Sequence, residues 1–256
     1  MRISVVIPVI NEKEDLPCTL RALAEFSDLY EIIIVDGGST DGTRESLSHR
    51  LPAHARVIDS PRGRGNQLNA GAHAATGDIV LFLHADTRLP PNAVQQITEA
   101  LSEEEVAGGG FCVRFLEEEP WTLRVVTVGI NFRTRLFRSP TGDQAIFSRR
   151  AAFAAAGGFA QWPIFEDVDF VHRLKRVGRF AIVPSHVTTS ARRYITRGVL
   201  RTVFLMYALR VGFWFGVSHF RLHRWFRDVR PHLLQDRKCA TLQMDKRESA
   251  RERVRP

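Results

Sequence analysis

Apolar residues in the first half of the chain occur in short runs separated by longer stretches of helical composition. The runs are rich in Val and Ile and fall at residues 3–9, 31–35, 56–58 and 78–83. Stretches of helical composition at 12–26 and 40–51 lie between them. Strands that alternate with helices predict an α/β fold: a Rossmann-like, mostly parallel sheet with helices on both faces.

The pattern continues to about residue 195, where we expect the first domain to end. The predicted helices lie at 90–101, 121–137, 149–156 and 166–177, and the predicted strands at 106–115, 145–148 and 179–183. Residues 196–236 form a second block of amphipathic helical composition. The tail at 237–256 holds 7 basic and 3 acidic residues, and this polar composition predicts disorder.

Residues 189–227 combine eight arginines with many aromatic residues and contain no acidic residue. Uncharged runs such as 202–209 are too short to span a bilayer. We therefore expect amphipathic helices at 197–227 that lie on an anionic membrane surface. The alternative is that the apolar residues pack on the rest of the protein or in a homodimer.

Charge is distributed unevenly around the net value of +8. Residues 1–120 carry a balance of −9 and residues 121–256 a balance of +17, which indicates an anionic partner. We expect no nucleic acid, because the apolar periodicity at Leu200, Phe204 and Phe215 requires burial. The N-terminal apolar run is too short for a signal peptide, which predicts a cytoplasmic protein, at most peripheral at the inner face of the cell membrane.

Polar or glycine-rich residues follow each predicted strand, where parallel sheets bind ligands. Between 36 and 43, Asp36 and Asp41 can accept hydrogen bonds from a base or ribose, and the glycines allow close backbone approach. The alternative is an ordinary turn in which Asp41 or Thr40 caps the next helix. At the end of another predicted strand, Asp86 can bind a hard divalent cation that bridges a diphosphate, or it can serve as a turn residue.

Two further segments carry candidate chemistry. The segment 63–71 is glycine-rich, but it lacks both the G-x-G-x-x-G pattern and the Lys-Ser/Thr of a P-loop, which argues against hydride transfer and P-loop hydrolysis. Its Arg64 can contact phosphate, or the segment is a simple loop into a helix. Glu166 and Asp167 open a predicted helix, where one carboxylate can deprotonate an acceptor hydroxyl or both can cap the helix.

Together these motifs resemble a known family. In order, they are Val6-Ile7-Pro8-x-x-Asn11-Glu12, Asp36-Gly37-Gly38-Ser39-x-Asp41-Gly42-Thr43, Gly63-Arg64-Gly65, Asp86, Gly142-Asp143-Gln144 and Glu166-Asp167. The chain resembles family 2 glycosyltransferases of the GT-A fold over residues 3–195. With the segment 189–193, it is similar to the subgroup named for its genomic association with radical-SAM and selenium-domain proteins.

The resemblance implies an inverting transfer of a sugar from a nucleoside diphosphate sugar, with a UDP-sugar favoured, to the hydroxyl of an unassigned acceptor. It implies a divalent cation, Mn or Mg, as cofactor. The residues expected around the nucleotide are Pro8, Asn11, Glu12, Asp36, Gly38, Asp41, Arg64 and Ala85. Asp86 and His84 are expected at the metal, Asp167 with Glu166 at the catalytic base, and Asp143, Gln144, Arg192 and Arg193 at phosphate or acceptor.

The sequence departs from the family pattern at two positions. Gly37 stands where the family commonly has a second aspartate, and His84 begins what is usually an Asp-x-Asp motif, which predicts weak metal affinity. Two other functions are open. A sugar-phosphate nucleotidyltransferase would have a glycine-rich, basic loop where this chain has 4–12, and a non-catalytic nucleotide-sugar binding subunit would not need Asp86 and Asp167.

Overall fold

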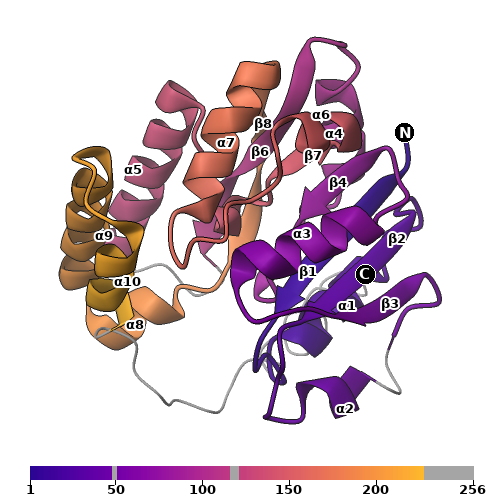
Figure 1. Cartoon of the computed structure of the whole chain (residues 1–256), viewed down its shortest axis with the longest axis horizontal. Helices are drawn as coiled ribbons and strands as arrows, with labels where there is room; N and C mark the ends of the chain where they lie inside the picture. The colour runs from indigo at the N-terminus through magenta and orange to yellow at the C-terminus, as the bar shows by residue number, and fades with distance from the viewer. Residues whose placement is uncertain (48–50, 116–120, 228–256) are drawn as a thin grey trace, which may run out of the picture.

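The computed structural model describes residues 1–47, 51–115 and 121–227, and a mixed sheet runs through them (Figure 1). The strands are β1 (Ile3–Val9), β2 (Glu31–Asp36), β3 (Ala55–Asp59), β4 (Ile79–Phe82), β5 (Thr87–Arg88), β6 (Val106–Phe115), β7 (Phe147–Arg149) and β8 (Arg179–Thr189). The helices are α1 (Leu16–Leu23), α2 (Thr43–Leu47), α3 (Arg64–Ala74), α4 (Ala93–Ala100), α5 (Trp121–Phe137), α6 (Arg150–Ala155), α7 (Glu166–Val177), α8 (Arg192–Arg197), α9 (Val199–Trp214) and α10 (His219–Arg227).

Within these residues the strand order is β3-β2-β1-β4-β7-β6-β8-β5. The first four strands are parallel, β7 is antiparallel to both its neighbours, and β6 and β8 are parallel. The predicted α/β sheet with helices on both faces is confirmed. β5 was not predicted, because two residues that pair with the far end of β8 carry no periodicity of their own.

Two apolar cores lie on opposite faces of the sheet. Val5 and Ile7 of β1 pack on the face covered by α1 and α4, whereas Val6 between them packs with residues of α3 and α7 on the other face. Because both faces are covered, β1 is a continuous apolar run and does not alternate with polar residues.

Helix α3 lies unusually close to the strands. A Cβ atom on Gly71 would lie 2.3 Å from a Cγ of Val6, and one on Gly65 would lie 2.4 Å from the carbonyl oxygen of Ala160. These two glycines of the segment 63–71 therefore serve close packing, and the loop itself contributes Arg64.

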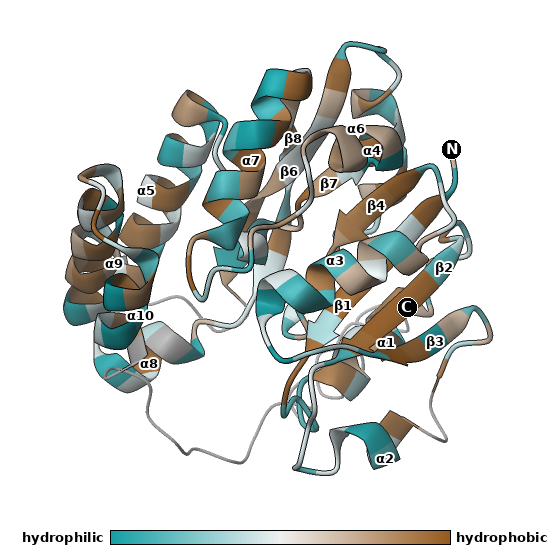
Figure 2. Ribbon diagram, viewed as in Figure 1, coloured by the Kyte–Doolittle hydropathy of each residue, from teal (hydrophilic) through white to brown (hydrophobic). Residues whose placement is uncertain are grey.

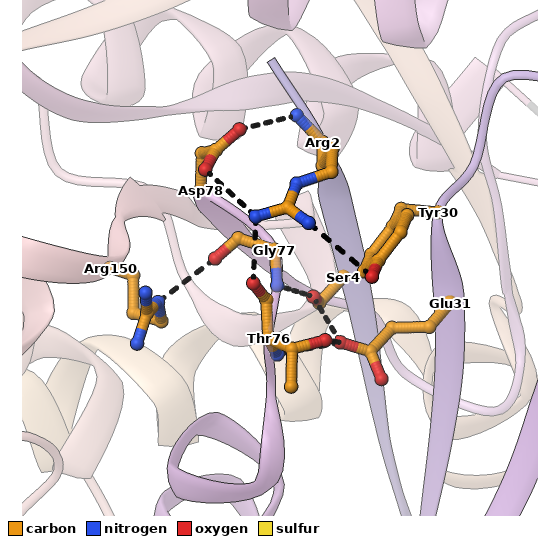
Figure 3. A network of polar contacts seen from close by, with 8 residues as sticks. All are labelled: Arg2, Ser4, Tyr30, Glu31, Thr76, Gly77, Asp78 and Arg150. Atoms are coloured by element: carbon orange, nitrogen blue, oxygen red, sulfur yellow. Dashed lines mark hydrogen bonds and ion pairs between the residues drawn. The ribbon is translucent and has the colours of Figure 1, made fainter.

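A polar network ties together the amino ends of the strands, away from the predicted ligand loops (Figure 3). The Oε1 atom of Glu31 accepts hydrogen bonds from the Ser4 hydroxyl (2.8 Å) and from the backbone nitrogen (2.7 Å) and hydroxyl (2.8 Å) of Thr76. Its Oε2 atom accepts from Arg56 at 3.0 Å. Burial opposes the effect, but these hydrogen bonds lower the pKa of Glu31 to about 2. β1, β2, β3 and the turn before β4 are joined through one carboxylate.

The C-terminal helices pack on the sheet domain and are not a detached block. Leu209 of α9 and Leu222 of α10 form a cluster with Ile164 in the segment before α7. The alternative prediction, that apolar residues of 197–227 pack on the rest of the protein, therefore holds for the faces of α9 and α10 that form this cluster. No helix within the described ranges is long and apolar enough to cross a bilayer. Residues 228–256, which include the predicted disordered tail, lie outside the described residues.

Candidate active site

The loops after β1 and β2 are cross-linked to each other. Asn11, in a left-handed conformation (φ 56°), accepts a hydrogen bond from the backbone nitrogen of Thr40 at 2.8 Å. Its own backbone nitrogen donates to the Ser39 hydroxyl at 3.0 Å, and that hydroxyl donates to Asp36 Oδ1 at 2.7 Å. The structure therefore brings Asn11 and Asp36, both predicted at the nucleotide, into one rigid loop pair; Pro8 lies just before, near the end of β1.

Gln67 of α3 fixes the two strand ends that carry these loops. Its buried amide donates to the carbonyl oxygens of Val9 (2.8 Å) and Val35 (2.9 Å). A Cβ atom on Gly37 would lie 2.9 Å from Gln67 Cδ and 2.8 Å from Ile10 Cδ1. A side chain at position 37 would displace this brace, which gives a physical reason for the glycine where the family commonly has an aspartate.

Asp41 is engaged inside its own loop. Its Oδ1 atom accepts from the backbone nitrogen and the hydroxyl of Thr43, and its Oδ2 atom accepts from the backbone nitrogen of Lys13 at 3.2 Å. This geometry favours the capping interpretation of Asp41 over a direct nucleotide contact. Gly38 (φ 87°) is exposed, and a Cβ there would meet no atom within 4 Å.

The turn after β4 holds Asp86 against a group of carboxylates. Thr19 of α1 donates to the carbonyl oxygen of Ala85 at 2.5 Å, and Ala85 is 4% exposed, so Ala85 anchors the turn. Burial and then the charge of Asp15 raise the pKa of Asp86. Burial, Asp86 and Asp15 together raise the pKa of Glu12 to about 7.

Arg192, at the start of α8, partly compensates this negative charge. Its Nη2 atom lies 3.0 Å from Asp15 Oδ2, and its charge opposes the rise in the pKa of both Glu12 and Asp86. The prediction that Arg192 contacts phosphate or acceptor stays a prediction, and the structure places its guanidinium beside these carboxylates. The side chain of Arg193 lies outside the described residues.

The donor set at Asp86 fits a divalent cation of the Mg or Mn type. No three His, Cys, Asp or Glu side chains in the described part of the chain form a closed metal site. Mg and Mn prefer oxygen ligands, and Mg usually keeps waters and phosphates beside one or two carboxylates. Asp86 would be the ligand, and the crowded charges of Glu12 and Asp15 would favour a cation there.

The surroundings of His84 disfavour its predicted role as a metal ligand. Its Nε2 atom lies 3.4 Å from Arg64 Nη1, and it lies 2.8 Å from where a Cβ of Gly142 would be. A cation bound to Nε2 would adjoin the guanidinium, which disfavours the predicted ligation.

Arg64 and Glu166 form an ion pair at the bottom of the site. The Nε–Oε1 distance is 2.8 Å, and Glu166 is 1% exposed. Burial raises the pKa of Glu166, and the Arg64 charge opposes that rise. Since its oxygen is already paired and it has almost no exposed surface, Glu166 positions Arg64 and is poorly placed as the base.

Asp167 is the more accessible carboxylate of the pair. Its Oδ2 atom accepts a hydrogen bond from the backbone nitrogen of Gly142 at 2.7 Å, which fixes its orientation. It lines a small pocket together with Arg64, Leu68, Phe82, His84, Gly142, Ile146, Phe159 and Glu166. The left-handed residue Phe165 (φ 66°) turns the chain into α7, so that both acids fall in the first helical turn.

Gln144, predicted at phosphate or acceptor, has its side chain engaged within the protein in this structure, which disfavours a direct ligand contact. Gln144 is 0% exposed, its Oε1 atom accepts from the backbone nitrogen of Thr141 (3.0 Å) and the Thr134 hydroxyl (3.1 Å), and its Nε2 atom donates to the carbonyl oxygen of Phe111 (2.9 Å). It braces the turn that presents Gly142 to Asp167. Asp143 of the same turn is half-buried and accepts from the Thr141 hydroxyl at 2.5 Å.

Sequence reasoning missed Asp15 and Gln67. Asp15 meets Arg192 only because the start of α8 comes back over the first loops, and no local spacing indicates such a contact. Gln67 stands in a helical segment whose amide could have pointed to solvent. Its role depends on α3 packing against β1 and β2.

Comparison with known proteins finds a matching family. The model of the family "Glycosyl transferase family 2" matches residues 4–154, more than half of the chain. An uncharacterized glycosyltransferase of Nostoc sp. is 36% identical over 113 residues, 42% of this chain and 35% of that protein. The undecaprenyl-phosphate 4-deoxy-4-formamido-L-arabinose transferase of Enterobacter sp. is 33% identical over 151 residues, 55% of this chain and 44% of that protein. The chain thus spans less than half the length of these two relatives.

Solved structures share the fold at low sequence identity. A mannosyltransferase from Pyrobaculum calidifontis in complex with GDP-Man and Mn²⁺ has a TM-score of 0.60 and 20% identity, covering 74% of this chain and 56% of that one. Glucosyl-3-phosphoglycerate synthase from Mycobacterium tuberculosis, in complex with Mn²⁺, UDP-glucose and phosphoglyceric acid, has a TM-score of 0.54 and 22% identity, covering 72% and 70%. By its family match, the chain belongs to glycosyl transferase family 2.

Proposed function

We propose that this protein is an inverting glycosyltransferase that moves a sugar from a nucleoside diphosphate sugar, with a UDP-sugar favoured, to an acceptor hydroxyl. The observation that carries the proposal is the pocket in which Asp167, oriented by the backbone of Gly142, lies beside the Arg64–Glu166 ion pair. The mannosyltransferase and the glucosyl-3-phosphoglycerate synthase with similar folds hold GDP- or UDP-sugars with Mn²⁺.

Each residue has a distinct task in the proposed reaction. The loops of Asn11 and Asp36 hold the nucleoside, and Arg64, kept in place by Glu166, binds the diphosphate through charge-assisted hydrogen bonds. Asp167 accepts the proton of the acceptor hydroxyl while the oxygen of that hydroxyl forms a bond to the anomeric carbon. The bond between that carbon and the diphosphate breaks, and the electron pair leaves with the nucleotide.

A divalent cation held by Asp86 would stabilise the negative charge on the departing diphosphate. The carboxylates around Asp86 support this part of the proposal, since Glu12 and Asp15 place negative charge beside it that Arg192 opposes only in part.

Donor hydrolysis tests the proposed activity without knowledge of the acceptor. Purified protein is incubated with UDP-, GDP- and dTDP-sugars, with and without Mn²⁺, because many transferases slowly use water as acceptor. We expect release of one nucleoside diphosphate that depends on Mn²⁺ and on Asp167. Release of a nucleoside monophosphate, or no binding of any of these donors, would contradict the proposal.

We further propose that the enzyme works against an anionic lipid surface, through α5 as well as the C-terminal helices. Both α5 and α9 lie at one edge of the molecule and are rich in apolar residues (Figures 1 and 2). Apolar side chains that are more than half exposed recur along both helices, at Trp121, Val125, Val128, Phe132, Leu136, Leu200, Phe204, Tyr207, Val211 and Trp214. The amphipathic surface is therefore larger than the predicted segment 197–227.

Charge favours a lipid surface over a homodimer as the occupant of this face. Segments 121–142 and 186–227 contain twelve arginines and no Asp or Glu. A two-fold dimer would bring the same arginine-rich patch against itself, whereas basic residues near an anionic bilayer contribute about 1 kcal/mol each. Exposed aromatic side chains between them provide interfacial anchoring.

Flotation with liposomes tests the membrane proposal. Protein should float with vesicles that contain phosphatidylglycerol, less at high salt, and not with neutral vesicles. Phe132→Ser should weaken flotation, and Val177→Ser, at an exposed apolar position on α7, serves as the matched control. Absence of flotation together with a dimer in size-exclusion chromatography would favour the homodimer instead.

A further inference from the structure

Arg133 of α5 holds a guanidinium group that the proposed mechanism does not use. In the part of the chain that the structure describes, its Nε and Nη2 atoms are buried and have no hydrogen-bond partner. None of the ion pairs among those residues includes it. A guanidinium presents five donors and stays charged in proteins. Burying two of its nitrogens without hydrogen-bond partners therefore raises the free energy of the folded state.

Hydrogen bonds of the side chains near Arg133 fix the rotation of α5 about its own axis. Asn131 donates to and accepts from the backbone of Val113 in β6, at 2.9 and 2.8 Å. The Thr134 hydroxyl donates to Gln144, which braces the turn at Gly142. α5 therefore cannot rotate to carry Arg133 into solvent without breaking these buried hydrogen bonds.

The charged groups nearest to Arg133 belong to the proposed acceptor side of the site. Burial lowers the pKa of Arg133, and Asp143 opposes that shift most, followed by Tyr207 of α9, Asp167 and Tyr194 of α8. Neither carboxylate is within ion-pair distance of Arg133. The guanidinium thus lies in the electrostatic neighbourhood of the catalytic base while its own donors are unsatisfied.

The geometry points to Arg133 as the binding residue for a phosphate group on the acceptor. A phosphate oxygen matches the donor fork of a guanidinium, and it would satisfy the Nε and Nη2 atoms, which have no partner within the described ranges. This inference rests on the proposed glycosyl transfer, because it concerns the acceptor of that reaction. Two sources share the chemistry: a water-soluble phosphomonoester, and a phosphomonoester on a lipid chain that lies along the exposed apolar residues of α5.

Binding of simple phosphomonoesters to the whole protein tests the inference. Glycerol phosphate and hexyl phosphate are titrated calorimetrically into protein with and without UDP and Mn²⁺. Wild type should bind at least one of them, and Arg133→Met should weaken that binding at least about tenfold, the scale of a charged hydrogen bond. Arg135→Met, at an exposed arginine on the same helix, is the matched control and should bind as wild type does.

Stability and nucleotide binding separate a binding role from a structural one. Because the Nε and Nη2 atoms of Arg133 have no hydrogen-bond partner among the described residues, Arg133→Met should leave the melting temperature unchanged or raise it, and should not alter UDP affinity. A lowered melting temperature, equal phosphate binding by Arg133→Met and wild type, or no phosphate binding by wild type would overturn the inference. Arg133-dependent phosphate binding in a protein that binds no UDP would instead contradict only the proposed donor.

Stronger binding of hexyl phosphate than of glycerol phosphate would identify the lipid source. Equal binding, or a preference for glycerol phosphate, would identify a soluble acceptor. Either result supports a phosphate site at Arg133.

Discussion

Glu31 offers a test of the structure that does not depend on any assumption about function. Its side chain is 12% exposed, and its carboxylate joins Ser4 and Thr76 at the amino ends of the strands (Figure 3). Arg56 also donates a hydrogen bond to it. Glu31→Gln keeps an oxygen for the contacts with Ser4 and Thr76, but it removes the negative charge and turns an amide group toward Arg56. The change therefore isolates the charge of one buried network.

The magnitude follows from the pKa of Glu31, which falls from 4.5 to about 2 on folding. Each pKa unit corresponds to about 1.4 kcal/mol, so the ionised carboxylate contributes about 3 kcal/mol near neutral pH. Because the folded pKa is the lower one, this contribution is present above pH 4.5 and is lost as the pH falls toward 2. About 2 kcal/mol should disappear between about pH 6 and about pH 3.

Urea unfolding at these two pH values measures the effect. Near pH 6 the free energy of unfolding should be about 2–3 kcal/mol lower for Glu31→Gln than for wild type, and near pH 3 the difference should shrink to about 1 kcal/mol. Glu104→Gln, at an exposed position before β6, is the matched control and should follow wild type at both values. If the free energy of unfolding of Glu31→Gln were lower than that of wild type by the same amount at both pH values, the electrostatic explanation would be refuted.

Three further predictions concern the site and its support. Asp86→Ala should abolish Mn²⁺-dependent UDP binding in calorimetry without unfolding the protein, and unchanged affinity would remove Asp86 from the metal site. Asp167→Asn should keep UDP binding but lower turnover by at least about 10²-fold. Glu166→Gln should instead lower the free energy of unfolding by about 2–3 kcal/mol, because it removes the charge that compensates Arg64; the reverse pattern would exchange their roles. Gly71→Ala should cost about 1–3 kcal/mol in urea unfolding, since the added Cβ would lie 2.3 Å from a Val6 methyl carbon, and unchanged stability would contradict the close packing of α3.

The sequence by itself determined the elements whose periodicity is local. The predicted bounds of β1, β6, α5 and α7 are confirmed, because long apolar runs and helical spacing are properties of neighbouring residues. It also indicated which loops carry chemistry, since polar and glycine residues after parallel strands meet at one edge of the sheet. Similarity to a subgroup of the family stays a prediction.

Only the tertiary structure decided which of these polar residues remain available to a ligand. Glu166 and Asp167 are adjacent in sequence, yet one is buried against Arg64 and the other lines the pocket, because α7 begins with a left-handed residue and packs on α3 and the Gly142 turn. Gln144 belongs to a family motif, but its side chain is occupied by hydrogen bonds within the protein, including one to Phe111, which lies 33 residues away in the sequence. Burial and pairing depend on contacts between distant segments, and no local pattern records them.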